Sequence, residues 1–124
     1  MNPISYRPKS LLYSDVIVTV VSTIAIDGLV FHKPVVLFSF EPKDGLSDTI
    51  GKFSTNPHFK KFLDSGLIAT GHNKLEFIEY LNTYLKDPTA DKEKRDQLAL
   101  RYAYRLDGKS AERVADCLLR VLST

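Results

Sequence analysis

Two short apolar runs, separated by a helical pattern, dominate the first third of the chain. Residues 15–20 (DVIVTV) and 34–39 (PVVLFS) are rich in β-branched and aromatic side chains and do not alternate with polar positions. Runs of this kind are typical of strands that are buried on both faces in a parallel sheet. Between them, Ser22 and Thr23 are helix-capping residue types, and Pro34 stops the helical pattern. The pattern predicts a strand, helix and strand unit with a right-handed crossover.

Helical periods return after residues 41–56, which are polar, contain glycine and predict a long loop. Residues 57–66 predict a short helix and residues 67–70 a third strand. Asn73 and Glu76 resemble a capping box that starts the next helix. Its apolar stripe is Leu75, Ile78, Leu81 and Leu85. Two more amphipathic helices are expected. The one over 89–106 has the stripe Leu98, Tyr102 and Leu106, and the one over 110–122 has the stripe Ala111, Val114, Ala115, Leu118 and Leu122.

This order of elements predicts an α/β fold, a small three-stranded parallel Rossmann-like half sheet covered by helices. Residues 1–8, which contain two prolines and no period, are interpreted as a leader or linker, and residues 9–124 as one domain. A sheet of three strands leaves an exposed edge. We therefore expect either self-association of the chain or a partner polypeptide.

The composition narrows the class of protein. The 124 residues suffice for one small domain, and 44% hydrophobic with 26% charged residues is typical of a globular one. The longest apolar run is too short to span a bilayer, and the amino end lacks the apolar core of a secretory signal, so a cytoplasmic protein is expected. A net charge of +2 with mixed signs does not favour nucleic-acid binding.

Residues that could bind metals are few and scattered. Cys117 is the single cysteine, and we expect it to pack as a buried thiol on the last helix. His32, His58 and His72 show no metal-like spacing, so neither a metal site nor a cofactor is predicted. Residues 52–62 interleave lysines with phenylalanines and are superficially similar to RNA-binding sequences. Two of these phenylalanines lie three residues apart, which is more typical of the buried stripe of a helix.

The turn after the first strand is the strongest candidate for a binding site. In open parallel sheets, ligands bind beyond the carboxyl ends of the strands. The unpaired N–H groups at the start of the following helix suit a phosphate, and Ser22 and Thr23 add hydroxyl donors. Asp27, one turn further along, could accept two hydrogen bonds from the vicinal hydroxyls of a ribose. The alternative is that Ser22 only caps the helix and Asp27 only faces water.

Residues 14–41, SDVIVTVVSTIAIDGLVFHKPVVLFSFE, resemble the carboxyl-terminal domain of glycosyltransferases built from two Rossmann-like domains, the GT-B type. The closest pattern is that of the CDP-glycerol glycerophosphotransferases and related surface-polysaccharide enzymes, and hydrolysing UDP-sugar 2-epimerases share a looser version. Residues 84–122 resemble the closing "DP…R…Y…DGK-A-RV" segment of the same family. The matching positions of the first segment are Ser14-Asp15, Thr19, Ser22-Thr23, Asp27 and Lys33-Pro34, with Glu41 where these transferases often carry an acid.

The resemblance implies the donor-nucleotide-binding part of a glycosyl- or glycerophosphotransferase for surface-polymer synthesis. Thr19, Ser22 and Thr23 would then hold the diphosphate of a CDP- or UDP-linked sugar or polyol. Asp27 would hold the ribose or the polyol, and Glu41 would lie near the outer end of the donor. The resemblance also implies a missing amino-terminal domain that holds the acceptor, so no catalytic residue is assigned and the isolated chain is expected to be inactive. The full enzyme would act in the cytoplasm, at the membrane surface.

Departures from the family pattern keep a second interpretation open. Val20 stands where the glycerophosphotransferase pattern usually has Asp, and Val21 and His32 stand where many relatives have Gly. A Cβ atom at a phosphate-facing turn restricts the approach of the backbone. These departures favour a non-catalytic α/β interaction module derived from the same fold.

Overall fold

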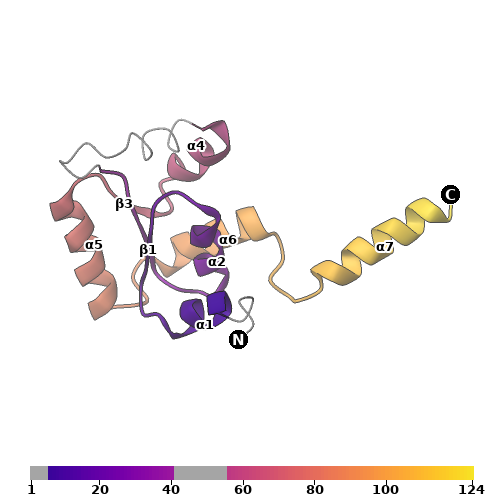
Figure 1. Ribbon diagram of the computed structural model, residues 1–124, viewed down its shortest axis with the longest axis horizontal. Coiled ribbons are helices and arrows are strands. Elements are labelled where there is room, and N and C mark those ends of the chain that lie inside the picture. Colours follow the sequence, from indigo (N-terminus) through magenta and orange to yellow (C-terminus); the bar gives the residue numbers. More distant parts are fainter. Residues whose placement is uncertain (1–5, 41–55) are drawn as a thin grey trace.

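The computed structural model describes residues 6–40 and 56–124 and places three short strands in one open sheet (Figure 1). The strands are β1 (Ile17–Thr19), β2 (Val35–Phe38) and β3 (Ala69–Gly71). Their order is β1-β2-β3, and both neighbouring pairs are parallel, with Val36 of the central strand opposite Val18 and Ala69. The predicted three-stranded parallel α/β fold is therefore confirmed. The ends of each strand lie within about two residues of the predicted ends.

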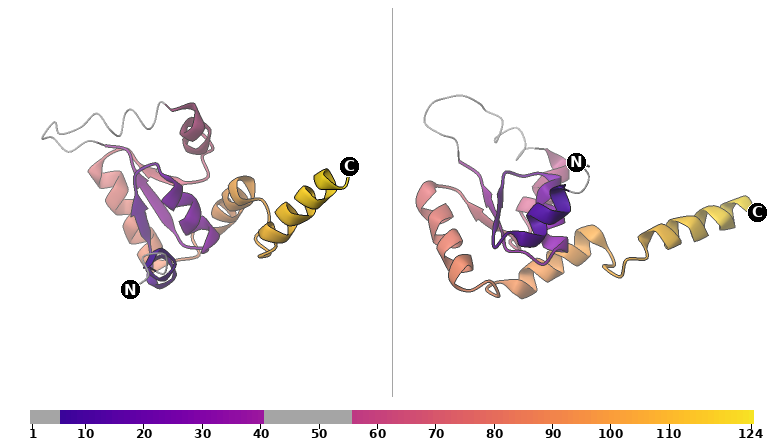
Figure 2. Two further views of the ribbon diagram at one scale, coloured as in Figure 1. Left: turned by 45° about the vertical axis from the view of Figure 1, so that its right-hand side comes forward. Right: turned by 60° about the horizontal axis from the view of Figure 1, so that its bottom comes forward.

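The described part of the chain contains six helices. Helix α5 covers one face, while α2, backed by α6, covers the other (Figure 2). The hydrophobic core lies between the sheet and these two helices. It contains Leu29 of α2, Leu37 of β2 and Leu98 of α6, each at most 1% exposed. The helices are α1 (Tyr6–Tyr13), α2 (Thr23–Val30), α4 (Pro57–Leu63), α5 (Lys74–Lys86), α6 (Lys92–Ala103) and α7 (Ser110–Leu122).

Two glycines allow the helices to approach the sheet closely. A Cβ atom on Gly28 would lie 2.8 Å from the Ile17 Cδ1 atom and 2.9 Å from the Val35 Cγ2 atom. A Cβ atom on Gly71 would lie 2.7 Å from the backbone of Phe77. Gly28 lowers the helix propensity of α2, but its missing side chain is what lets α2 pack against β1 and β2.

Helix α5 begins as predicted but packs with a different face. The Asn73 side chain accepts the Glu76 N–H at 2.9 Å, and the Glu76 carboxylate accepts the N–H of His72 at 3.1 Å. Most of the stripe expected to pack is instead exposed, since Leu75 is 70% and Leu85 is 60% exposed, and only Leu81 of the four is half-buried. The helix turns an aromatic face inward, on which Tyr84 is 2% exposed and Phe77 contacts Phe38 edge-on.

The corner between α5 and α6 is built around a buried arginine. Arg95 is 5% exposed, and its guanidinium donates to the carbonyl oxygens of Pro88, at 2.7 Å, and Ala90. The same guanidinium lies 5.4 Å from the centroid of the Tyr84 ring. The Tyr84 hydroxyl donates to Asp91 at 2.8 Å. The "DP…R" part of the closing segment therefore fixes a turn between two helices.

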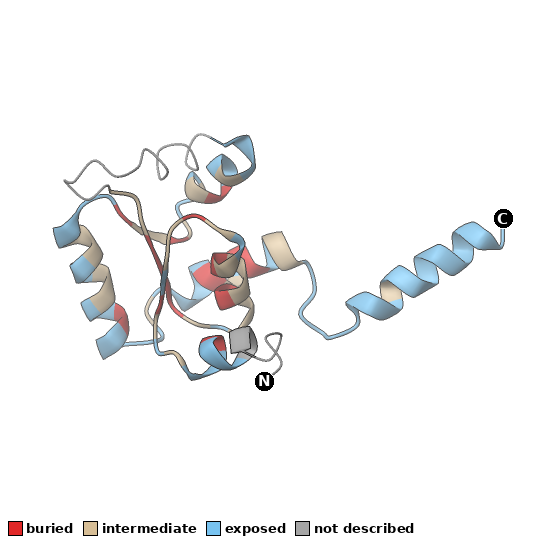
Figure 3. Cartoon of the chain, viewed as in Figure 1, coloured by how far each residue is buried: buried red, intermediate tan, exposed pale blue. Residues whose placement is uncertain are grey.

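The two terminal helices differ from the sequence-based predictions. The pattern did not predict α1, in which Pro8 lies in the first turn, where its missing N–H costs no helical hydrogen bond. Helix α7 spans the predicted residues, but it extends away from the body and none of its residues is buried (Figure 3). The expectation of a packed Cys117 is wrong, because the thiol is exposed together with the rest of α7.

Neither a bilayer-spanning helix nor a metal-binding cluster occurs in residues 6–40 and 56–124. The helices there are too short and too polar to cross a membrane. No group of three or more His, Cys, Asp and Glu side chains in these residues is placed to hold a metal ion.

Candidate functional site

Because all three strands are parallel, their carboxyl ends meet at one edge of the sheet. Thr19 ends β1, Ser39 follows β2 and His72 follows β3. The Ser39 N–H donates to the Gly71 carbonyl oxygen at 2.8 Å, which continues the pairing of β2 with β3 past the last strand residue. Parallel sheets of this kind bind their ligands at this edge. The edge carries two separate groups of polar side chains.

The first group lies in the turn between β1 and α2. Thr19 Oγ1 is 3.1 Å from Ser22 Oγ, so a hydroxyl at the strand end and a hydroxyl at the helix start are hydrogen-bonded. Ser22 occupies the N-cap position of α2, but its side chain makes no capping hydrogen bond. The Ser22 hydroxyl therefore bonds to Thr19 instead of to the first N–H groups of α2, while the Ser22 carbonyl oxygen accepts the N–H of Ala25 at 3.1 Å. Thr23 is exposed at the first position of α2.

Asp27 lies one turn further along α2 and is half-buried. None of the six ion pairs formed between described residues includes its carboxylate. The structure thus brings Thr19, Ser22 and Thr23 together at one turn, with Asp27 on the same helix. Glu41, the remaining predicted site residue, lies outside the described residues.

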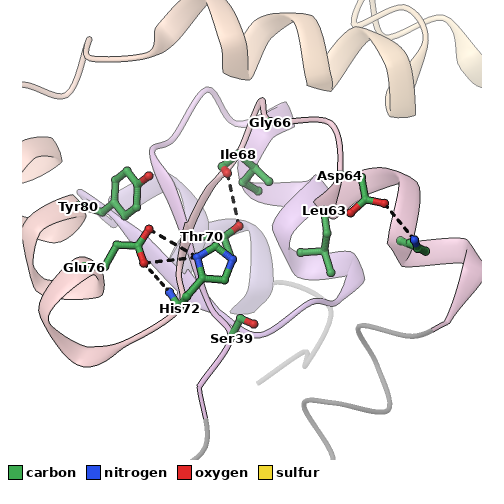
Figure 4. A pocket seen from close by; sticks show the side chains of 10 residues that line it. Ser39, Leu63, Asp64, Gly66, Ile68, Thr70, His72, Glu76 and Tyr80 are labelled. Carbon is green, nitrogen blue, oxygen red and sulfur yellow. Dashed lines mark hydrogen bonds and ion pairs between the residues drawn. The ribbon is translucent and has the colours of Figure 1, made fainter.

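The second group lines a pocket of about 430 Å³ at the ends of β2 and β3, between α4 and α5 (Figure 4). Hydroxyl groups come from Ser39, Thr70 and Tyr80. The remaining lining residues are Lys60, Leu63, Asp64, Gly66, Ile68, His72 and Glu76.

The charges of this pocket are already paired. His72 Nδ1 lies 3.3 Å from Glu76 Oε2, and Lys60 Nζ lies 3.5 Å from Asp64 Oδ2. Both ion pairs join residues four positions apart, and three of the four side chains are mostly exposed while Glu76 is half-buried, so solvent weakens the pairs. A pocket with paired charges and several hydroxyls suits an uncharged, hydrogen-bonding group better than a free phosphate.

Sequence reasoning assigned none of these pocket residues to a site. The spacing of His72 argues against a metal ligand, and Glu76 is predicted only to cap a helix. A usable signal was nevertheless present, because Ser39 ends the second predicted strand and His72 comes two residues after the third. The rule that ligands bind beyond the carboxyl ends of parallel strands could have indicated both positions.

The open parallel sheet, with hydroxyl and carboxylate side chains at its carboxyl edge, defines a small Rossmann-like α/β domain. A family model described as CDP-glycerol:poly(glycerophosphate) glycerophosphotransferase matches residues 6–120. The chain therefore belongs to this family, which confirms the resemblance found in the sequence. It contains a glycerophosphotransferase-type domain of polymer synthesis, and the family name identifies a nucleotide-activated donor. Comparisons with curated proteins and with solved structures gave no match.

Proposed function

We propose that the chain binds the nucleotide-activated donor of a glycerophosphotransferase, with the donor's diphosphate at the start of α2. The observation that carries this proposal is the β1–α2 turn, where the Ser22 hydroxyl is paired with Thr19 and leaves the helix start without a side-chain cap. The first N–H groups of a helix have no partner within the helix and carry partial positive charge. A diphosphate supplies the acceptors that such a turn requires.

Each residue of the turn has a separate role in the proposed site. Thr19 orients the Ser22 hydroxyl through their 3.1 Å contact. Thr23, exposed beside it, donates its hydroxyl to the diphosphate. Asp27 accepts hydrogen bonds from vicinal hydroxyls of the ribose or of the polyol, one helical turn from the phosphates. In the family's transfer, these groups stabilise the nucleotide phosphate that leaves as the acceptor oxygen bonds to phosphorus.

We further propose that turnover requires a polypeptide in addition to the described domain. No catalytic base is assigned to the described residues, and the turn and the pocket provide binding groups rather than an acceptor site. The donor is CDP-linked glycerol or a related nucleotide-activated polyol or sugar, in agreement with the family name.

A second candidate function is a non-catalytic interaction module. Two apolar residues of the β1–α2 turn, Val20 and Val21, favour this alternative. Val21 is 5% exposed and belongs to the core, and half-buried Val20 stands where the glycerophosphotransferase pattern carries Asp. Side chains at these positions limit how closely a diphosphate approaches the backbone. Donor binding at this turn is therefore expected to be weak, about millimolar.

Titration with CDP-glycerol, CDP and CMP, followed by amide chemical shifts in two-dimensional NMR, tests the proposal. We expect shifts centred on residues 19–27, and we expect them to disappear in a Ser22→Ala/Thr23→Ala double variant. A Thr83→Ala variant is the matched control, because its hydroxyl bonds only within α5, to the Glu79 carbonyl oxygen. Shifts confined to other residues, or none at 10 mM ligand (about ten times the expected Kd), would leave the non-catalytic module as the better account.

A further inference from the structure

The pocket at the ends of β2 and β3 is separate from the β1–α2 turn, because none of its lining residues belongs to β1 or α2. Its apolar surface comes from Leu63 of α4 and from Ile68, which is 7% exposed. Hydroxyl-bearing side chains from Ser39, Thr70 and Tyr80 line the same pocket. Apolar surface combined with a few polar groups is typical of a site for a small molecule.

The charges of the lining disfavour an anionic ligand. One cation, Lys60, stands against the two carboxylates of Asp64 and Glu76, and protonation of His72 only brings the sum to zero. A phosphate would therefore meet two charges of its own sign at close range. The same carboxylates accept hydrogen bonds from hydroxyl groups. The lining thus favours an uncharged ligand that carries several hydroxyls.

The side chains of Thr70 and Tyr80 are placed to bind such a ligand. Thr70 Oγ1 donates to the Ile68 carbonyl oxygen at 3.4 Å, which is long for a hydrogen bond and easily exchanged for a ligand group. The Tyr80 ring stacks on the buried Tyr84, with 6.4 Å between centroids and 20° between planes, which fixes its position. In Figure 4, Tyr80 lies across the pocket from Asp64, so a ligand between them has partners on both sides.

The volume of the pocket suits a sugar better than glycerol. If each non-hydrogen atom takes the roughly 30 Å³ that one molecule occupies in liquid water, glycerol with its six such atoms needs at most about 180 Å³. A hexose with twelve needs at most about 360 Å³, which is close to the 430 Å³ of the pocket. Three side chains of the lining, Lys60, Asp64 and His72, are 63–68% exposed, so the pocket is open to solvent. A sugar that is linked to a larger molecule can therefore enter it.

We propose that this pocket binds a single uncharged sugar unit of hexose size. The C–H groups of the sugar ring pack on Leu63 and Ile68. The Thr70 and Tyr80 hydroxyls bond to the oxygens of the sugar, and the sugar hydroxyls donate to the Asp64 carboxylate. The site lies outside the turn proposed for the donor diphosphate, so it goes beyond the proposed function and does not depend on it.

Amide chemical shifts of the full chain, recorded during titration with sugars and smaller molecules, test the proposal. Glucose, galactose and N-acetylglucosamine are the sugar probes, glycerol is the smaller polyol, and glycerol 3-phosphate is the anion. We expect at least one sugar to shift the signals of residues 66–80 with a Kd of about 1–10 mM. Glycerol should bind at least about tenfold more weakly because it makes fewer contacts, and glycerol 3-phosphate should not shift these signals. No shift in this segment with any of the three sugars at about 100 mM, or tighter binding of glycerol 3-phosphate than of the sugars, would overturn the proposal.

The double variant Thr70→Val/Tyr80→Phe removes two hydroxyls of the pocket and keeps the shapes of the side chains. It should weaken sugar binding at least about tenfold, since each lost hydrogen bond weakens binding several-fold. The matched control Tyr13→Phe/Thr83→Val removes the same groups elsewhere, at an 80% exposed tyrosine and at a threonine that bonds within α5, and should bind sugar as the parent chain does. Ser39→Ala, with an expected weakening of about threefold, replaces the double variant if circular dichroism shows that the latter unfolds. Unchanged sugar binding in the folded pocket variant would contradict the proposal.

Titration of UDP-glucose into the parent chain and into the Ser22→Ala/Thr23→Ala variant distinguishes two sources of the sugar. If the donor nucleotide carries the sugar, UDP-glucose shifts both the turn and the pocket, and the variant weakens both effects. If the sugar binds independently of the donor, the variant keeps the pocket shifts and loses only those at the turn. Shifts at the turn with none in the pocket, for UDP-glucose and the free sugars alike, would overturn the sugar site and leave the donor proposal standing. Pocket shifts with none at the turn would support the sugar site and count against the donor proposal alone.

Discussion

Replacing Arg95 by methionine tests whether the α5–α6 corner stabilises the fold as its geometry indicates. The substitution keeps an unbranched side chain of similar length in a site that is only 5% exposed. It removes the donors to the carbonyl oxygens of Pro88 and Ala90 and the cation that lies 5.4 Å from the Tyr84 ring centroid. Arg95 donates to these two carbonyl oxygens only in the folded state, so the substitution removes hydrogen bonds from the folded state alone.

The magnitude follows from these three interactions. A hydrogen bond from a charged donor contributes about 1.5–3 kcal/mol, and a cation over an aromatic ring about 1 kcal/mol more. The desolvation of the guanidinium offsets part of this gain. We expect Arg95→Met to lower the free energy of unfolding by about 2–4 kcal/mol. Arg95→Lys, which keeps the charge but loses the planar fork, should lower it by about half as much.

Urea unfolding followed by far-ultraviolet circular dichroism measures this difference. Arg101→Met is the control, because Arg101 is an exposed residue of the same helix, and it should change the free energy of unfolding by less than about 0.5 kcal/mol. Equal midpoints for Arg95→Met and Arg101→Met would refute the reasoning, since the part-buried hydrogen bonds of Arg95 would then contribute nothing beyond helix propensity.

Three further predictions concern packing, pH and activity. Gly28→Ala should lower the free energy of unfolding by about 1–3 kcal/mol in the same urea assay, because its Cβ atom would lie 2.8 Å from Ile17; an unchanged midpoint would contradict the close packing. Burial and the hydrogen bond to Asp91 raise the pKa of Tyr84, because the folded state favours its neutral form. The contribution of neutral Tyr84 to folding stability is therefore present below the ordinary tyrosine pKa and is lost as the pH rises above about 10. Tyr84→Phe should flatten the alkaline decline in urea midpoints, whereas the control Tyr13→Phe, at an 80% exposed site, should not. Finally, the purified chain should release no CMP from CDP-glycerol in a chromatographic assay, and release that Asp27→Ala abolishes would show that the chain suffices for catalysis.

Local sequence patterns by themselves determined the strands, the caps and the candidate turn. The β-branched runs before Ser22 and after Pro34 predicted two parallel strands, because only strands buried on both faces lack polar alternation. Asn73 predicted the start of α5, since N-capping depends on residues only three positions apart. The turn at Ser22 was predicted for the same reason, because a strand followed at once by a helix places its hydroxyls beside the helix start.

Only the tertiary structure decided which faces are covered and which groups meet across elements. Helix α5 has two overlapping stripes of helical period, one aliphatic and one aromatic, and the position of β3 selected the aromatic stripe with Tyr84. The burial of Arg95 depends on carbonyl oxygens that a turn brings within its reach. The pocket beside His72 joins residues of β3, of two helices and of the segments that follow β2 and β3. Among the helices of residues 6–40 and 56–124, α7 has a pronounced amphipathic pattern, yet periodicity specifies an apolar face and not the surface that covers it.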